Sequence, residues 1–146
     1  PMLVGAGAAA LTKGKYADDD DLAVARAIFE SAAQVTIVQE PLMDAVTAVS
    51  GSGPAYFFYL VEAMVDAGVK LGLTKDQALA LSRQTAFGAA KLLVSSADSP
   101  EELRRKVTSP GGTTFAAISK MDEAGMKATI IKAIESAAAR SKELRH

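Results

Sequence analysis

A loop of glycine and hydroxyl side chains, residues 109–114, has the composition best suited to bind a ligand. Its sequence is Ser-Pro-Gly-Gly-Thr-Thr, and two successive glycines let the backbone turn and expose its N–H groups. The next helix is predicted to begin near Thr113, which places these N–H groups at the positive end of a helix, where anions bind. We therefore predict a carboxylate or phosphate site, with hydroxyl groups from Ser109, Thr113 and Thr114. The alternative is a structural Gly-Gly turn that only begins the helix.

The sequence gives less support to two nucleotide-binding motifs than to an anion site at residues 109–114. The loop has no lysine in a G-K-[ST] arrangement, so a P-loop is not predicted. Residues 5–10 match the dinucleotide fingerprint G-x-G-x-x-A, but only four residues precede Gly5, and Gly14 interrupts the helix that should follow. We predict a strand of small residues there instead.

Other chemistry is mostly excluded by composition. The chain has no cysteine, and its one histidine is the last residue, His146. A thiol nucleophile, a Ser-His-Asp triad and a site with several histidine ligands are therefore not expected. Residues 18–21, four aspartates, could bind a divalent cation, but they precede a helical pattern and are better explained as stabilising its N-terminus. No metal site is predicted. The lysines considered as catalytic amines are interpreted as solvated: Lys13, Lys15, Lys70 and Lys91.

Charge and hydropathy exclude two kinds of partner. Sixteen basic and 17 acidic residues give a net charge of −1, which provides no electrostatic footprint for nucleic acid. The most apolar segment, residues 54–71, contains Glu62, Asp66 and Lys70, so no membrane-spanning helix is expected. The chain opens without a basic leader, and a cytoplasmic location is the default expectation. The opening Pro-Met-Leu-Val also suggests a cut made inside a larger protein.

The hydropathy pattern changes at about residue 40. Residues 1–40 are predicted to form a strand, a helix and a strand, because a helical pattern separates small-residue and β-branched runs. From residue 41 onward only helices are predicted, with a break at 50–54. Their ranges are 41–50, 54–71, 74–95, 99–107, 115–124 and 126–144. Two start with capping boxes, Thr74 with Gln77 and Ser99 with Glu102. Helix 54–71 is apolar on all but one narrow stripe and is predicted to be buried on most sides.

Three segments carry distinctive sequences, in this order: DAVTAVSGSGPAY at residues 44–56, LVEAMVDAGVKLGL at 60–73 and VTSPGGTTFAAISKMD at 107–122. Together they resemble the signature of the pyrroline-5-carboxylate reductases, and the opening PMLVGAG is similar to the family as well. The resemblance extends over essentially the whole chain, which looks like the C-terminal half of these proteins. It implies a mainly α-helical fold: residues 1–40 end a Rossmann-type α/β domain, and residues 41–146 form an all-helical substrate-binding and dimerisation domain.

The resemblance also implies an activity, hydride transfer from NADP or NAD in reduced form to the C=N bond of 1-pyrroline-5-carboxylate. The product is L-proline, and this is the last step of proline biosynthesis. The implied substrate-binding residues are Ser109, Gly111, Gly112, Thr113 and Thr114. Thr114 is the implied catalytic residue, since its hydroxyl would hydrogen-bond the ring nitrogen. Lys106 stands where family members often have an asparagine that contacts the cofactor, which makes it a weak cofactor-binding candidate. Since the glycine fingerprint would lie upstream, the chain alone is expected to be inactive.

Two other functions remain open. A non-catalytic helical dimerisation module would explain the apolar helix 54–71 equally well, but it would not need the loop at 109–114. The helical domain of a 3-hydroxyacid dehydrogenase relative would carry a Gly-x-x-Gly-x-Gly-x-x-x-Lys helix, which this sequence lacks. A homodimer, or a larger assembly of dimers, is the expected partner state.

Overall fold

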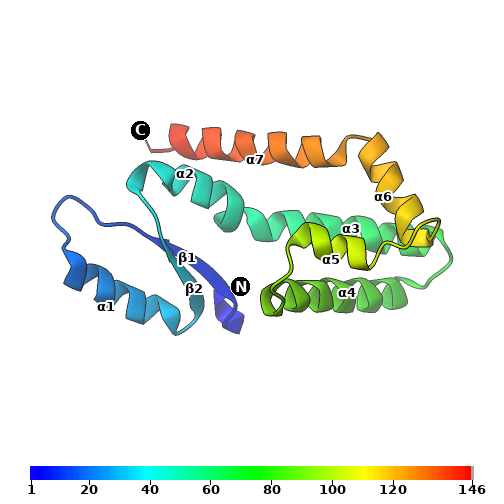
Figure 1. The fold of residues 1–146 in the computed structure, drawn as a ribbon, viewed down its shortest axis with the longest axis horizontal. Helices are drawn as coiled ribbons and strands as arrows, with labels where there is room; N and C mark the ends of the chain where they lie inside the picture. Colours follow the sequence, from blue (N-terminus) through cyan, green and yellow to red (C-terminus); the bar gives the residue numbers. More distant parts are fainter. Residues whose placement is uncertain (146) are drawn as a thin grey trace. The chain divides into compact units, whose positions relative to one another are not determined.

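The fold is given by a computed structural model, which describes residues 1–145 (Figure 1). His146, the one histidine, lies outside the described residues. The strands and helices are, in chain order, β1 (Gly7–Leu11), α1 (Asp19–Glu30), β2 (Ala33–Ile37), α2 (Met43–Val46), α3 (Gly53–Lys70), α4 (Lys75–Ser95), α5 (Pro100–Lys106), α6 (Thr113–Glu123) and α7 (Met126–Glu143). The mainly helical fold class, with a short strand–helix–strand segment first, is confirmed. The chain forms two compact units, Pro1–Ala55 with Ile131–His146, and Tyr56–Ile130.

The first unit contains the strand–helix–strand segment. β1 and β2 pair in parallel, with Gly7 opposite Ala33 and Leu11 opposite Ile37. In Figure 1, α1 lies on one side of the two strands and α2 on the other. The aspartate cluster begins α1 as predicted, because Asp18 caps the helix and forms a capping box with Asp21. The predicted function of these aspartates in stabilising a helix N-terminus therefore has a direct structural basis.

The start of the chain differs from the expected extended run. Met2–Val4 forms a short 3-10 helix, and Gly5 follows it with φ +68°. The strand of small residues begins only at Gly7, where a Cβ atom would lie 2.5 Å from Met2 Cγ. The fingerprint residues 5–10 therefore form a turn followed by a strand, not the strand–turn–helix that holds a dinucleotide.

The predicted break at residues 50–54 is shorter than expected, because only Ser52 separates the two helical segments. Thr47–Gly51 forms a π-helix between α2 and α3, closed by the Ser52 N–H donating to the Thr47 carbonyl at 2.8 Å. The hydroxyl groups of Thr47 and Ser50 also donate to carbonyls four residues earlier, which is a recognised cause of helix bending. The chain thus changes its helical pitch at Thr47–Gly51 and is interrupted only at Ser52.

The second unit is helical, and small residues allow its first two helices to approach closely. The turn after α3 has the hydrogen bonds of a Schellman motif, from Leu73 N–H to Gly68 and from Gly72 N–H to Val69, with Gly72 at φ +101°. A Cβ atom on Gly68 would lie 3.0 Å from Ala78 Cβ on α4. The predicted capping boxes at α4 and α5 are both present.

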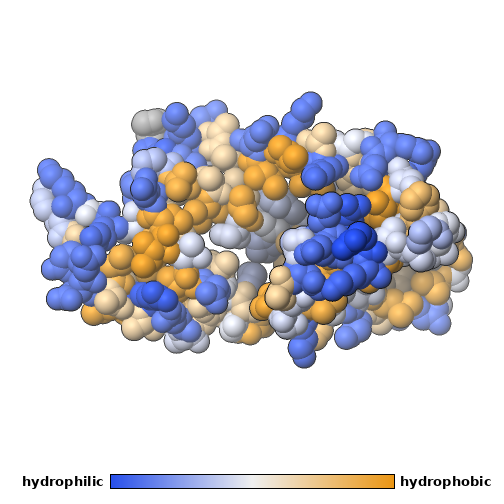
Figure 2. Space-filling view, in the orientation of Figure 1, coloured by the Kyte–Doolittle hydropathy of each residue, from blue (hydrophilic) through white to orange (hydrophobic). Residues whose placement is uncertain are grey.

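The apolar helix α3 is much more exposed than the sequence predicts. Phe57, Phe58 and Tyr59 are 62%, 64% and 76% exposed, whereas Val65 is buried at 9%. Apolar side chains are visible over much of the surface in Figure 2. Burial on most sides is therefore wrong for this chain by itself. In the described part, no helix combines the length and apolar character needed to cross a membrane.

Candidate functional site

The loop at residues 109–114 lies within the second unit and begins with a tight turn. The Gly112 N–H donates to the Ser109 carbonyl at 3.0 Å, with Pro110 and Gly111 at the two central positions. Gly111 has φ +69°, the sign that a type II turn requires at its third residue. Proline supplies the fixed φ of the preceding position, so the Pro-Gly-Gly sequence dictates this turn.

The turn leads directly into α6, and the first N–H groups of that helix are unpaired. Gly112 is the N-cap residue and has no side chain to cap the helix. Among residues 1–145, the backbone N–H groups of Thr113, Thr114 and Phe115 have no acceptor, while the Gly112 carbonyl accepts from Ala116. Three parallel donors at a helix N-terminus suit one carboxylate group.

This geometry changes the expected set of donors. The Gly112 N–H, predicted as a ligand-binding donor, is occupied by the turn. Phe115, which was not predicted, supplies the third free N–H instead. The sequence signal for it exists, because every helix leaves its first N–H groups unpaired once the N-cap is known. The predicted start near Thr113 agrees with the structure, but the use of the Gly112 N–H in the turn was not predicted.

The hydroxyl groups of the loop are also unpaired. Within residues 1–145, those of Ser109, Thr113 and Thr114 make no hydrogen bond, although Thr114 is half-buried. The hydroxyl of the neighbouring Thr108, in contrast, is paired, because its Oγ1 donates to the Arg104 carbonyl at 2.6 Å. Because Thr114 caps no backbone N–H, the purely capping explanation of this residue loses its support.

Ser109 and Gly112 are so close that a side chain at position 112 would displace the Ser109 hydroxyl. A Cβ atom there would lie 2.5 Å from Ser109 Oγ and 3.2 Å from the Ser109 carbonyl oxygen. The Ser109 hydroxyl therefore lies against the Gly112 backbone, beside the start of α6. The predicted site residues Ser109, Gly111, Gly112, Thr113 and Thr114 all lie in this turn or in the first turn of α6.

Helix α5 leads directly into the loop, since only Val107 and Thr108 separate them. Its final residue, Lys106, donates to Asp98 Oδ2 at 2.5 Å, and the two side chains are 59% and 31% exposed. The cofactor-binding function predicted for Lys106 is not tested by this pairing. The Lys106 ammonium group already has an anionic partner, Asp98, on the segment between α4 and α5.

The capping box of α5 should make the start of this helix sensitive to acid. The Ser99 N–H and hydroxyl donate to Glu102 Oε2 at 2.8 and 2.9 Å, and these bonds hold the pKa of the Glu102 carboxyl below its usual value. A lowered carboxyl pKa stabilises the folded state above the unfolded pKa, about 4.3, and this contribution disappears as pH falls through the folded pKa. We expect the protection of amides at the start of α5, measured as exchange relative to the intrinsic rate at each pH, to fall below about pH 4.3, and Glu102→Gln to remove that fall.

The other capping box provides an internal control. At the start of α4 the Thr74 N–H donates to Gln77 Oε1 at 2.9 Å and the Gln77 N–H donates to Thr74 Oγ1 at 3.2 Å, a capping box without a titratable group. Exchange at the start of α4 should therefore change less over the same pH range. Equal acid sensitivity at both helix starts would contradict the assignment to Glu102.

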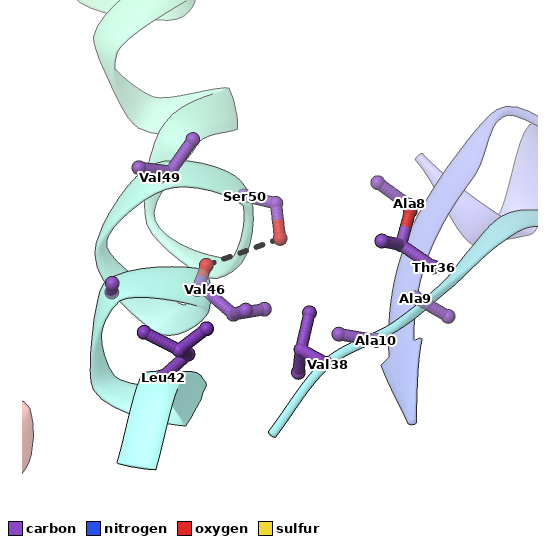
Figure 3. Close-up of a pocket in the computed structure, with 10 residues that line it drawn as sticks. Ala8, Ala9, Ala10, Thr36, Val38, Leu42, Val46, Val49 and Ser50 are labelled. Atoms are coloured by element: carbon purple, nitrogen blue, oxygen red, sulfur yellow. Dashed lines mark hydrogen bonds between the residues drawn. The ribbon is translucent and has the colours of Figure 1, made fainter. Parts of the chain in front are cut away.

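The described residues also form a cavity in the first unit, but its lining contains no titratable side chain. This cavity of about 370 Å³ lies between the strands and the α2–π-helix segment (Figure 3). Its lining is almost wholly apolar: Ala8, Ala9, Ala10, Thr36, Val38, Leu42, Ala45, Val46, Val49 and Ser50. Residues 1–145 contain no group of three or more potential metal ligands. Nor do they form a glycine-rich strand-to-helix turn, so they do not fit the pyrophosphate of a dinucleotide.

A helical part that follows a strand–helix–strand segment, with unpaired donors in one of its loops, agrees with what comparisons of the chain find. Residues 40–144 match the family model described as pyrroline-5-carboxylate reductase dimerisation. The chain is 45% identical over 144 residues to the pyrroline-5-carboxylate reductase of Synechocystis, covering 99% of this chain and 54% of that protein. It is 40% identical to the Arabidopsis thaliana protein of the same name, covering 99% and 52%.

Solved structures give the same result. The chain superposes on a pyrroline-5-carboxylate reductase from Coxiella burnetii with a TM-score of 0.91 and 40% identity, covering 97% of this chain and 53% of that one. The Plasmodium falciparum pyrroline carboxylate reductase, solved with NADP bound, gives 0.86 and 32%, covering 98% and 58%. The chain therefore belongs to the pyrroline-5-carboxylate reductase family. It spans about half the length of the curated relatives that it matches.

Proposed function

We propose that this chain supplies the substrate-binding and dimerisation part of an enzyme that reduces 1-pyrroline-5-carboxylate to L-proline with NADPH or NADH, in the cytoplasm. One observation carries the proposal: the loop at residues 109–114 presents three unpaired N–H groups and three unpaired hydroxyls together. The substrate has a carboxylate that such donors can bind and a ring nitrogen that a hydroxyl can reach. The family membership of the chain supports the choice of this substrate over other carboxylates.

In this proposal the chain orients the substrate. The N–H groups of Thr113, Thr114 and Phe115 bind the carboxylate together with the Ser109 hydroxyl, each bond strengthened by the ligand's charge. The Thr114 hydroxyl hydrogen-bonds the ring nitrogen and so fixes the adjacent C=N carbon. The reduced nicotinamide supplies the hydride for that carbon. A protonated imine is already electrophilic, so holding it in the reactive geometry is the main requirement.

The test compares two proteins in an assay for NADPH oxidation that depends on 1-pyrroline-5-carboxylate. The whole protein containing this chain should be active, with L-proline as the product. The 146-residue chain alone should be inactive, because its described residues offer no site for the cofactor's pyrophosphate. Lack of activity in the whole protein with either nicotinamide cofactor would refute the proposal.

The exposed face of α3 supports the second part of the proposal, a homodimer. Side chains such as Phe57, Phe58 and Tyr59 are exposed in the single chain, and obligate interfaces resemble a domain core cut in half. Two-fold dimers are the commonest closed assembly. A non-catalytic dimerisation module would use the same face, and the activity assay above separates the two functions.

Sedimentation equilibrium should give about 30 kDa for the chain at micromolar concentration, twice its mass of 15.1 kDa. Phe58→Glu should shift the mass toward the monomer while helix content is retained, because a charge cannot be buried unpaired in such an interface. Tyr16→Glu is the control, since Tyr16 is 89% exposed in the first unit and outside the helices. A wild-type monomer would exclude the dimer.

A further inference from the structure

Helix α5 is held in place largely by polar contacts, because only Leu103 among its residues is even half-buried. It has seven residues, none of them buried, and an isolated helix of this length is not stable in water. Its start is fixed by the Ser99–Glu102 capping box, and the Thr108 hydroxyl holds its final turn through the Arg104 carbonyl. Both contacts are local to the helix, so neither fixes the direction in which α5 leaves the α4–α5 connection.

One contact does tie the two ends of this segment together. Asp98, just before α5, accepts from Lys106, the last residue of α5, eight positions further along the chain. Asp98 is itself fixed by Ser96: the Ser96 hydroxyl donates to Asp98 Oδ2 at 3.1 Å, and the Asp98 N–H donates to Ser96 Oγ at 3.0 Å. The Lys106 and Ser96 bonds hold the pKa of the Asp98 carboxyl below its usual range. Hydrogen bonds thus join the two ends of the segment from residue 96 to residue 106, called the 96–106 segment below.

The 96–106 segment ends three residues before Ser109. Any rotation of α5 about its N-terminus moves Val107 and Thr108, and with them the turn whose carbonyl accepts from Gly112. That turn sets both the Ser109 hydroxyl and the first N–H groups of α6. The 96–106 segment is therefore connected to the candidate site through only two residues, Val107 and Thr108.

Resting on the function proposed above, we infer that Asp98 is a positioning residue for the substrate carboxylate. It holds Lys106, Lys106 holds the C-terminal end of α5, and α5 sets the turn that presents Ser109 and the N–H groups of α6. Asp98 touches no ligand in this arrangement. Its contribution is to substrate binding, because the carboxylate is held by the loop that α5 orients.

A double-mutant cycle in the whole protein tests this inference. Asp98→Asn and Lys106→Met should each raise KM for 1-pyrroline-5-carboxylate about two- to five-fold, the range for a partly exposed ion pair, and leave kcat unchanged. The double variant should be no worse than either single variant, because both remove the same interaction. Lys106→Arg, which can keep the ion pair, should retain most of the affinity.

A matched control is available on α6. The Lys120–Glu123 pair, at 2.9 Å, is an exposed ion pair in the same unit but near the other end of that helix. Lys120→Met should leave KM unchanged. If it raises KM as much as Asp98→Asn does, the effect is one of general charge, and the inference is wrong.

The outcomes separate a positioning residue from a direct contact. If Lys106 itself binds a ligand, Asp98→Asn will leave KM unchanged or lower it by freeing the ammonium group, while Lys106→Met alone raises it. That result, or additive effects in the double variant, would overturn the inference. Amide exchange of residues 111–115 in the 146-residue chain provides a readout without activity. Asp98→Asn should accelerate exchange there and Lys120→Met should not, so the inference can fail or hold even if the proposed reaction is wrong.

Discussion

Thr114→Ala will lower kcat/KM for 1-pyrroline-5-carboxylate at least about tenfold in the whole protein, with cofactor affinity unchanged. The lost hydrogen bond to the ring nitrogen is by itself worth about 0.5–1.5 kcal/mol. Misplacing the imine carbon relative to the hydride donor adds to that loss, since rate depends steeply on the geometry of the reacting atoms. Steady-state kinetics with both substrates varied will separate these effects.

Thr114→Ser is the matched control, because serine keeps the hydroxyl and loses only a methyl group. It should retain most of the activity. A threonine that only capped α6 would behave differently: Thr114→Ala would then cost about 0.5–2 kcal/mol of stability and leave kcat/KM unaltered. The structure weighs against that alternative, since Gly112 is the N-cap and the Thr114 side chain accepts no backbone N–H.

Gly112→Ala should raise KM for 1-pyrroline-5-carboxylate at least about tenfold and change the melting temperature little. The new Cβ would lie 2.5 Å from Ser109 Oγ, and a serine side chain can rotate away at small cost to folding. That rotation removes the Ser109 hydroxyl from the carboxylate site. Hydrogen bonds to charged groups are worth about 1.5–3 kcal/mol, which corresponds to roughly 10- to 100-fold in affinity.

Two other glycines serve as controls for this substitution. Gly88 lies within α4 and has no atom within 4 Å of an added Cβ, so Gly88→Ala should leave KM unchanged and stabilise the helix by up to about 1 kcal/mol. Gly125→Ala, at φ +68° beyond the other end of α6, should destabilise the protein without affecting KM. A normal KM in Gly112→Ala would show that the Ser109 hydroxyl does not bind the substrate.

Local hydrogen-bonding rules explain which elements the sequence predicts well. The capping boxes at Thr74 and Ser99 were predictable because all their partners lie within three residues of each other. The stop at Gly72 and the start of α6 near Thr113 follow from glycine geometry in the same way. The candidate loop could be predicted for the same reason, since its turn depends only on Pro110, Gly111 and Gly112.

Features that depend on more distant contacts were not predictable. A Ser-Gly-Ser-Gly-Pro sequence normally ends a helix, and no local rule indicates that Thr47–Gly51 continues as a π-helix. The apolar pattern of α3 shows that most of its surface is apolar, but it does not say whether a neighbour in the same chain covers that surface. The Asp98–Lys106 pair joins residues eight apart across a turn and a helix, beyond any fixed spacing rule.

The π-helix limits how insertions and deletions can accumulate in this part of the chain. A π-helical turn holds one more residue than an α-helical turn, so removing one residue between Val46 and Gly53 would restore regular α-helix. Because both kinds of turn complete one full rotation, the side chains of α3 beyond such a deletion would keep their direction, and Phe57 and Phe58 would face the way they face now. A deletion within α3 itself would have a different effect, since each residue of an α-helix advances by about 100° around the axis and every side chain beyond the deletion would turn by that amount. The π-helix is therefore the place where this part of the chain can lose one residue without changing the exposed face of α3.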